Sequence, residues 1–429
     1  MSKAPDHKPQ LWALVDCATF YCSCERLFRP DLANKPVVVL SNNDGCVVAL
    51  TPEAKALGFK RGDVFFKNRE RLDTAGVTVF SSNYALYGDI SRRVIMAMES
   101  LVPQVYQYSI DEAFIPLPGP LAAQAYEVGT AIVDRVAQWV GAPVRAGIGP
   151  TRTLAKLANH WAKKLGPVFQ LQAPSSPLED ILDKTPVEDI WGVGGRIAAK
   201  LRRMNVNTAR ELRDLEPALA GRLFNVLTEA TIFELRGSQR LTSDLLPGPR
   251  KTMVQSRSFG RRITEYNDLA EALAHHCAVA GERLRRENLR AGGLSIFFGS
   301  GYHDDKPFQT GATVNLSRPT NHTGQLIKAA SLALERSFVA GHKYQKAGIM
   351  LFELVDEAAP QRPSLFGPPP EVVRGQKLMA ALDTINSRYG RDTVRYSAQG
   401  DLDPQWGLRR DKLSEISTTD WAGLPKVNA

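Results

Sequence analysis

Three acidic residues stand at the ends or centres of apolar segments, where a carboxylate is costly to bury. Asp16 closes the apolar run LWALVD at 11–16, and Asp111 and Glu112 are adjacent within the alternating segment VYQYSIDEAFIPL at 105–117. If the two segments are neighbouring strands, the three carboxylates converge and repel one another unless cations lie between them. Hard oxygen ligands select magnesium, and two such ions can activate an attacking oxygen and stabilise a leaving one. The acids therefore indicate two-metal phosphoryl transfer.

A second interpretation is open for each acid taken alone. Asp16 could cap the helix that follows it, and Asp111 and Glu112 could lie on a solvated strand edge, paired with Lys or Arg. Which interpretation holds depends on the strands and helices that position the acids.

The first 175 residues alternate between strand and helix patterns. After the strand at 11–16 we expect a helix at FYCSCERLF (20–28) and strands at PVVVL (36–40) and CVVAL (46–50). The other elements expected are a helix at EAKALG (53–58) ending at Gly58, a helix at 84–101, the strand carrying the acid pair, a helix at 121–140, the strand VRAGIG (144–149) and a basic helix at TRTLAKLANHWAKKL (151–165).

The second half of the chain changes character twice. Short basic helices around WGVGG predict a small helical unit at 176–245, and LLPGPR (245–250) predicts a linker. Residues 251–355 then give strand, helix, strand, strand, helix and strand, the split βαβ order of a ferredoxin-like domain. A Pro-rich piece at 359–370 and a last helix at 376–390 follow. The fold class expected is α+β with several domains.

Composition narrows the class of partner. The 429 residues carry a formal net charge of +9, which favours a polyanion such as nucleic acid or an anionic membrane surface. No apolar run reaches the roughly 20 residues needed to cross a bilayer, and no signal peptide is evident, so we expect no membrane and a place in the cytoplasm or bacterial nucleoid. The five cysteines form no CxxC pair, so neither disulfides nor zinc is expected.

Several motifs resemble one family over nearly the whole chain. LWALVDCATFYCSCE and YSIDEAF are similar to the two catalytic motifs of the Y-family DNA polymerases, and SNNDGCVVA, EAKALG, SSNYALYGDIS, GIGPTRTLAKLANHWAKK, WGVGG, SRSFG and YQKAGIML resemble its UmuC branch. The resemblance implies a right-hand polymerase: a palm at 1–25 and 83–175, fingers at 26–82, a helical thumb with a helix-hairpin-helix at 176–245, a ferredoxin-like little finger at 251–355, and a C-terminal tail at 356–429. Error-prone translesion synthesis in the SOS DNA-damage response is the implied function.

The same resemblance assigns roles around the acids. Asp16, Asp111 and Glu112 match the catalytic acids that bind two Mg²⁺ ions, the carbonyl of Cys17 matches a further ligand, and Glu112 lies nearest the primer hydroxyl. Tyr21 matches the steric gate, whose ring collides with a ribose 2′-hydroxyl, although it could instead be an ordinary core residue. The implied nucleotide contacts are Phe20, Tyr21, Thr51, Lys55 and Lys163, but Thr51, Pro52 and Lys55 stand where many members have Asn, Tyr and Arg.

DNA contacts are expected in two places. In DIWGVGGRIAAKL, Gly192 and Gly194 permit a tight hairpin whose amides face a phosphate, and Arg196 and Lys200 follow it. Cations after the hairpin also include Arg202, Arg203, Arg210 and Arg213, and in the little finger we expect contacts from Arg257, Arg261, Arg285 and Arg286. These groups could equally be solvated faces that pair with nearby acids.

Partners follow from the resemblance and from one peptide. QRPSLF at 361–366 is similar to sliding-clamp-binding peptides, with Gln361, Leu365 and Phe366 as the implied contacts. The resemblance also implies primer-template DNA, dNTP, a UmuD-type dimer and a RecA filament. Two alternatives are a stand-alone DinB-type bypass polymerase and a non-catalytic DNA-binding scaffold. A nucleotide cyclase would explain neither the hairpin nor the little finger.

Overall fold

The computed structural model describes residues 10–171, 178–241, 250–301, 304–359, 370–390, 392–401, 406–414 and 418. The chain divides into two compact units. The first comprises Met1–Ser41, Gly45–Leu246 and Lys412–Ala429, and the second comprises Asn42–Asp44 and Pro247–Asp411. No helix in the described ranges is long and apolar enough to cross a membrane.

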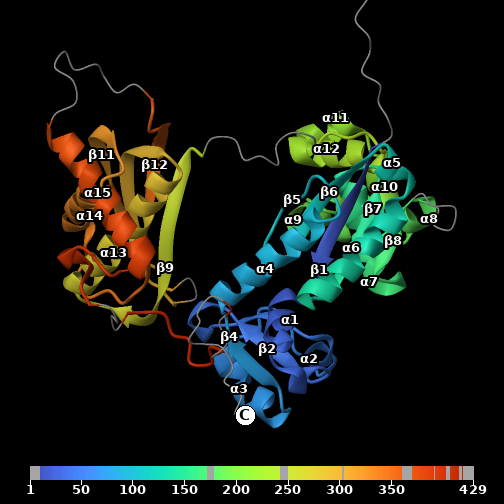
Figure 1. Cartoon of the computed structure of the whole chain (residues 1–429), viewed down its shortest axis with the longest axis horizontal. Helices are drawn as coiled ribbons and strands as arrows, with labels where there is room; N and C mark the ends of the chain where they lie inside the picture. The colour runs from blue at the N-terminus through green and yellow to red at the C-terminus, as the bar shows by residue number, and fades with distance from the viewer. Residues whose placement is uncertain are drawn as a thin grey trace, which may run out of the picture. The chain divides into compact units, whose positions relative to one another are not determined.

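A five-stranded sheet forms the centre of the first unit, with the strand order β5-β6-β1-β7-β8 (Figure 1). Its strands are β1 (Gln10–Cys17), β5 (Tyr106–Gln107), β6 (Glu112–Pro118), β7 (Val144–Gly149) and β8 (Val168–Gln170). Strand β1 is antiparallel to both β6 and β7, and β7 is parallel to β8. Because β1 has a neighbour on each side, its apolar run is buried along its length.

Helices cover both faces of this sheet. They are α4 (Tyr84–Glu99), α5 (Pro120–Ala123), α6 (Ala125–Val140) and α7 (Arg152–Leu165). Ala13 and Val15 of β1 pack in the core that includes α4 and α6, whereas Trp12 and Leu14 pack on the α7 side. Gly147 lets α7 lie close to β7, because a Cβ there would be 2.0 Å from the Asn159 backbone nitrogen.

The predicted single strand around the acid pair is two strands. Strands β5 and β6 form an antiparallel pair with Tyr106 opposite Phe114, and the chain turns between them. The Ser109 hydroxyl oxygen accepts the backbone N–H groups of Asp111 and Glu112 at 3.2 and 3.1 Å, which replaces strand hydrogen bonds at the turn. Asp111 therefore lies in the turn, and Glu112 is the first residue of β6.

Two smaller groups complete the first unit. A three-stranded sheet of order β3-β2-β4 contains β2 (Val37–Leu40), β3 (Val47–Leu50) and β4 (Thr78–Ser81), and its neighbouring elements are α1 (Phe20–Leu27), η1 (Pro30–Leu32), α2 (Pro52–Ala56) and α3 (Phe65–Thr74). The helical group contains α8 (Leu178–Asp183), η3 (Val187–Asp189), α9 (Gly195–Arg203), α10 (Ala209–Asp214), α11 (Pro217–Leu223) and α12 (Val226–Leu235). Gly58 has a φ of +86°, as expected for the residue that ends the EAKALG segment.

The second unit confirms the predicted order of strands and helices. It contains β9 (Thr252–Ile263), α13 (Tyr266–Arg286), β10 (Leu289–Gly299), β11 (Gln309–Thr320), α14 (Thr323–Ser337), β12 (Tyr344–Asp356), α15 (Pro370–Tyr389) and η4 (Ser397–Gln399). The sheet order is β11-β10-β12-β9, all antiparallel, which is a variant of the ferredoxin-like plan. Helices α13 and α14 supply the apolar side chains that cover one face of this sheet (Figure 1).

The C-terminal stretch belongs to the second unit as far as Asp411. Met379 of α15 is buried, and Trp406 is buried against Phe259 and His275. Arg285 of α13 holds Asp383 of α15 through two hydrogen bonds of 2.6 and 2.8 Å. Through these contacts Met379, Asp383 and Trp406 pack within the second unit.

Candidate active site

Asp16 and Glu112 face each other across two hydrogen-bonded strands. Antiparallel pairing of β1 and β6 sets Asp16 directly opposite Glu112, on the face of the sheet that α7 covers. Asp16 is only 9% exposed. Burial raises the pKa of Asp16 above its ordinary value, Lys163 lowers it, and Glu112 and Asp111 raise it further. The register of two strands has brought together like charges that need a cation.

Asp111 is tied to the end of β1 by the backbone. The Cys17 amide donates a 2.9 Å hydrogen bond to the Asp111 carbonyl oxygen, and the Ser109 hydroxyl donates one of 2.5 Å to the Asp111 carboxylate. Burial raises the pKa of the Cys17 thiol, so the thiol stays protonated. If Cys17 binds a cation, the ligand is its carbonyl oxygen, which is the atom that the family resemblance implies.

Two lysines of α7 pair with two of the three acids. Lys156 Nζ lies 2.6 Å from Glu112 Oε2, and Lys163 Nζ lies 3.6 Å from Asp16 Oδ2. The two lysines are seven residues apart and so share one helix face. Sequence reasoning named Lys163 but missed Lys156, although this spacing on a helix next to the acids was a usable signal.

Aromatic rings hold Lys156 in place. Its ammonium lies 4.9 Å from the ring centre of Tyr108 and 5.5 Å from that of Trp191. Trp191 opens the WGVGG segment and also packs at 5.5 Å against Tyr108 and at 5.7 Å against Phe114. The hairpin segment is thus in contact with the acidic site through its tryptophan.

The donor set suits magnesium in its chemistry. Asp16 and Glu112 line a cavity of about 120 Å³, together with Lys156, Lys163 and others. Within the described ranges, no three His, Cys, Asp or Glu side chains lie close enough together to hold one metal ion. The acidic side chains lie farther apart than the ligands of a single ion would, and the ammonium groups of Lys156 and Lys163 supply the positive charge beside them.

Tyr21 lies in a group of four aromatic residues. Its ring is stacked on Tyr87, with centroids 4.6 Å apart and planes inclined by 15°, and meets the edge of Tyr84 at 6.0 Å. Phe20 is buried beside it, 5.9 Å away. Burial raises the pKa of Tyr21, and Tyr84 and Asp111 raise it further.

The other predicted nucleotide contacts differ in accessibility. Thr51 is fully buried, and its hydroxyl oxygen accepts the N–H groups of Val37 and Ala54 at 3.1 and 3.4 Å. It acts here as the N-cap of α2. Lys55 is exposed on the same short helix, and Lys163 is half-exposed next to Asp16. The two lysines are available to an anionic ligand, and the Thr51 hydroxyl is already engaged.

The predicted hairpin is present before α9. Gly192 has a φ of +89°, a conformation that favours glycine, and Gly194 is the N-cap of α9. Arg196 and Lys200 are exposed, and no ion pair to either is found among the described residues. By contrast, the structure pairs Arg202 with Glu188, and pairs Arg210 and Arg213 with acids of α8 and α10.

The arginines of the second unit also divide into two kinds. Arg261 and Arg286 are exposed, and Arg257 is half-buried. Arg285 is committed to Asp383 and also donates to the Asn321 carbonyl at 2.6 Å, with its side chain only 12% exposed. Arg285 therefore anchors α15, and its contact with DNA stays a prediction. The proposed clamp contacts Gln361, Leu365 and Phe366 lie outside the described residues.

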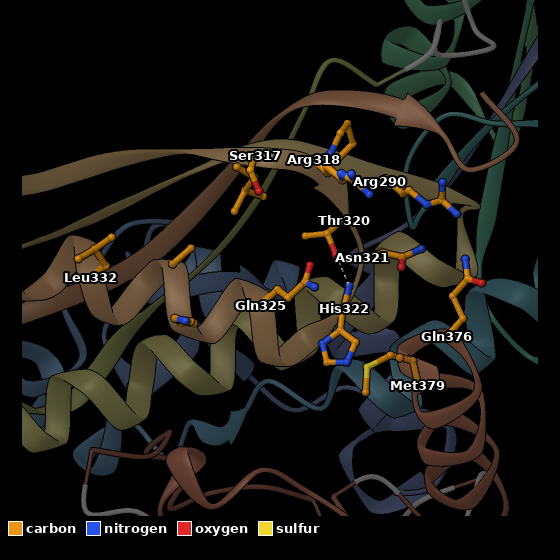
Figure 2. Close-up of a pocket in the computed structure, with 15 residues that line it drawn as sticks. Arg290, Ser317, Arg318, Thr320, Asn321, His322, Gln325, Leu332, Gln376 and Met379 are labelled. Carbon is orange, nitrogen blue, oxygen red and sulfur yellow. Dashed lines mark hydrogen bonds between the residues drawn. The ribbon is translucent and has the colours of Figure 1, made fainter. Parts of the chain in front are cut away.

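A second cavity, of about 340 Å³, lies within the second unit between the end of β11, α14 and α15 (Figure 2). Arg318, His322 and Gln325 come from the first two elements, and Gln376 and Met379 face them from α15. Among the described residues, no Asp or Glu lines this cavity, so it lacks the carboxylate ligands of the first one.

Comparisons with known proteins agree across the chain. Residues 15–160 match the impB/mucB/samB family, residues 250–364 match the C-terminal domain of the same family, and residues 376–427 match a domain of unknown function. The chain is 39% identical to Protein UmuC of Salmonella typhimurium strain LT2, over 97% of this chain and 100% of that protein. Protein SamB of Salmonella typhimurium is also 39% identical, over 97% and 99%.

More distant relatives and solved structures point the same way. DNA polymerase IV of Desulfatibacillum aliphaticivorans is 28% identical over 90% of this chain and 95% of that protein. A Y-family DNA polymerase chimera of Dbh and Dpo4 superposes with a TM-score of 0.62 at 16% identity, covering 81% of this chain and 99% of that chain. The insertion ternary complex of Dbh DNA polymerase gives a TM-score of 0.52 with the same coverage. These two likenesses establish a shared fold.

Proposed function

The chain belongs to the impB/mucB/samB family and is a Y-family DNA polymerase of the UmuC type, and we propose that Asp16, Asp111 and Glu112 hold two Mg²⁺ ions at its active site. The observation that carries the site is the direct opposition of Asp16 and Glu112 across β1 and β6, with Asp111 tied to β1 through Cys17. The reaction is template-directed, error-prone translesion DNA synthesis in the SOS response.

The metal ions, when bound, supply a Lewis acid for the primer hydroxyl and for the phosphates of the nucleotide. The protein's share is to place the charges. Rigid strands fix the carboxylates of Asp16 and Glu112, and the Ser109 turn fixes that of Asp111. Glu112 serves the primer side, and the Cys17 carbonyl is a further ligand.

Lys156 and Lys163 keep the site neutral until its ligands arrive. We assign Lys163, which is half-exposed and 3.6 Å from Asp16, to the triphosphate, because a flexible ammonium can exchange one anion for another. Lys55 is assigned to the same triphosphate. Phe20 and Tyr21 lie beneath the sugar, where the Tyr21 ring excludes a 2′-hydroxyl.

DNA is held through its backbone. The amides at Gly192 and Gly194 and the exposed cations Arg196 and Lys200 suit one strand of the duplex, and Arg257, Arg261 and Arg286 of the second unit suit another stretch. Contacts of this kind are independent of sequence, as a polymerase requires. We place the protein at the bacterial nucleoid for the same reason.

Three protein partners are proposed on the resemblance to the UmuC branch: a UmuD-type dimer, a RecA filament and a sliding clamp bound through Gln361, Leu365 and Phe366. A stand-alone DinB-type polymerase is less favoured, because identity to UmuC and SamB is 39% and identity to a DNA polymerase IV is 28%. A requirement for the accessory dimer in bypass would separate the two types.

The function is tested by primer extension with the full chain on undamaged and damaged templates, with and without the accessory dimer. We expect extension that depends on Mg²⁺ and is lost in Asp111→Ala. Asp134→Ala, which removes an exposed acid of α6 in the same unit, is the matched control and should keep full activity. Extension that persists in EDTA or in Asp111→Ala would leave only the DNA-binding scaffold.

A further inference from the structure

The Tyr87 ring stacks on one face of the Tyr21 ring. It lies in the first turn of α4, is fully buried, and stacks on Tyr21 with centroids 4.6 Å apart and planes inclined by 15°. Tyr84, in the same turn, meets the edge of Tyr21. Stacked and edge-on rings of this kind restrict one another's tilt. The height and tilt of Tyr21 therefore depend on where Tyr87 is held.

Glu25 holds Tyr87 by its other end. The Tyr87 hydroxyl donates a 2.6 Å hydrogen bond to Glu25 Oε1. Glu25 lies one helical turn after Tyr21 on α1, so a single tyrosine contacts two successive turns of that helix, by its ring and by its hydroxyl. Glu25 is 2% exposed. Burying a carboxyl group this deeply costs free energy unless it has a hydrogen-bond partner. Here the partner is the Tyr87 hydroxyl, and the bond orients Tyr87.

The C-terminal segment reaches the same carboxylate. The Ser414 hydroxyl donates to Glu25 Oε1 at 3.4 Å and accepts a hydrogen bond of 3.0 Å from the Asn83 side-chain amide. The backbone beside it is fixed to β4, since the Ser81 N–H donates to the Lys412 carbonyl at 2.8 Å and the Lys412 N–H donates to the Ser81 hydroxyl at 3.0 Å. Residues 412–414 therefore close over the Glu25–Tyr87 pair.

We propose that Tyr87 and Glu25 are positioning residues for sugar selection: Glu25 fixes Tyr87, and Tyr87 fixes the Tyr21 ring at the height where it meets a 2′-hydroxyl. Both residues are buried, so neither presents a surface to a nucleotide. The inference rests on the proposed function, in which Tyr21 is the steric gate. The competing view is that Tyr87 and Glu25 only stabilise the first unit.

The discriminating measurement is the ratio of kcat/KM for a ribonucleotide to that for the matching deoxynucleotide, with the full chain on one primer-template. Tyr87→Leu removes the stacked ring and is expected to raise the ratio about three- to tenfold, as loss of an aromatic pair allows. Tyr87→Phe keeps the ring and loses the hydrogen bond, and Glu25→Gln weakens the same bond. Each should raise the ratio about twofold to threefold.

Stability is separated from positioning by Met98→Ala. Met98 is buried on the same helix and makes none of the ring contacts around Tyr21. The Met98→Ala substitution should lower Tm and leave the ratio of kcat/KM for the ribonucleotide to that for the deoxynucleotide unchanged. If Tyr87→Leu folds too poorly to assay, Tyr87→Phe and Glu25→Gln decide the question.

Two failures are distinguishable. An unchanged ratio in the Tyr87 and Glu25 variants, together with a raised ratio in Tyr21→Ala, overturns the positioning role and leaves the gate intact. An unchanged ratio in Tyr21→Ala overturns the gate and with it the inference, while Mg²⁺-dependent extension would still stand.

Discussion

The Lys156 ammonium nitrogen lies 2.6 Å from the Glu112 carboxylate and also lies over the rings of Tyr108 and Trp191. A fixed cation at this point lets the protein keep its acids close together before metal binds. If Glu112 is a metal ligand, as proposed, the same cation competes with the metal for it.

Replacing this lysine should therefore change the response to magnesium. In Lys156→Ala the Glu112 carboxylate loses its paired cation and is repelled by the other acids, so we expect a lower Tm in EDTA and a larger rise in Tm on adding Mg²⁺ than in the parent chain. Thermal unfolding across a magnesium titration measures both. Lys164→Ala is the control, because Lys164 is on the same helix but lies over Trp161. An equal magnesium response in the two variants would contradict the role of Lys156.

The buried Asp16 makes a prediction about pH. Burial raises its pKa in the folded protein above the ordinary value of 3.8, so the folded chain holds this proton more tightly than the unfolded chain. The resulting loss of stability is absent below the unfolded pKa, grows as pH rises from there, and is complete above the folded pKa. Asp16→Asn should therefore raise Tm in EDTA at pH 7 and leave it nearly unchanged at pH 3.

Asp16→Asn should raise Tm but lower primer-extension activity. Asp16→Asn removes one of the carboxylates proposed to hold Mg²⁺, and we expect primer extension to fall by about a thousandfold or more, in line with the several kcal/mol that a catalytic metal supplies. The stabilising effect of Mg²⁺ on Tm should fall with it. A variant that lost activity but kept the parent's magnesium-dependent Tm would show that Asp16 is not a metal ligand.

The hairpin predicts a salt dependence. Arg196 and Lys200 are exposed and lack ion pairs within the described part of the chain, so both are available to phosphates. Replacing both with Ala should weaken duplex binding and lower the slope of log K against log salt by about 1 per cation removed. Arg285→Ala is the contrast: it should lower Tm by freeing Asp383 and leave the slope unchanged. Fluorescence anisotropy at several salt concentrations measures the slope.

The C-terminal segment predicts a pattern of hydrogen exchange. A chain truncated after Asp411 loses the acceptor for the Ser81 amide and the contacts of Ser414 with Asn83 and Glu25. Peptides covering 80–87 should then exchange faster, while those covering β7 should not change. Ser414→Ala keeps the backbone pairing and should preserve protection at Ser81. Unaltered exchange at 80–87 in the truncated chain would mean that the segment does not bind there in solution.

The amino-acid sequence by itself determined which residues are chemically special and which elements carry them. Asp16 had to end an apolar strand, and the order of strands and helices at 251–355 followed from periodicity, because burial on one face imposes a period of 2 or 3.6 on apolar residues. Motif resemblance then made the acids specific. Tyr21, Lys163 and the hairpin at Gly192 and Gly194 were named in the same way.

Only the tertiary structure decided which residues meet. The lateral order β11-β10-β12-β9 depends on packing against α13 and α14, which element order does not fix. Arg285 finds its acid 98 residues further along the chain, and the alternatives of surface and DNA contact were both compatible with its local sequence. Periodicity identifies a buried face but not its partner across the core, so the contacts of Lys156 with Glu112 and of Tyr87 with Tyr21 and Glu25 emerged only once the helices were packed.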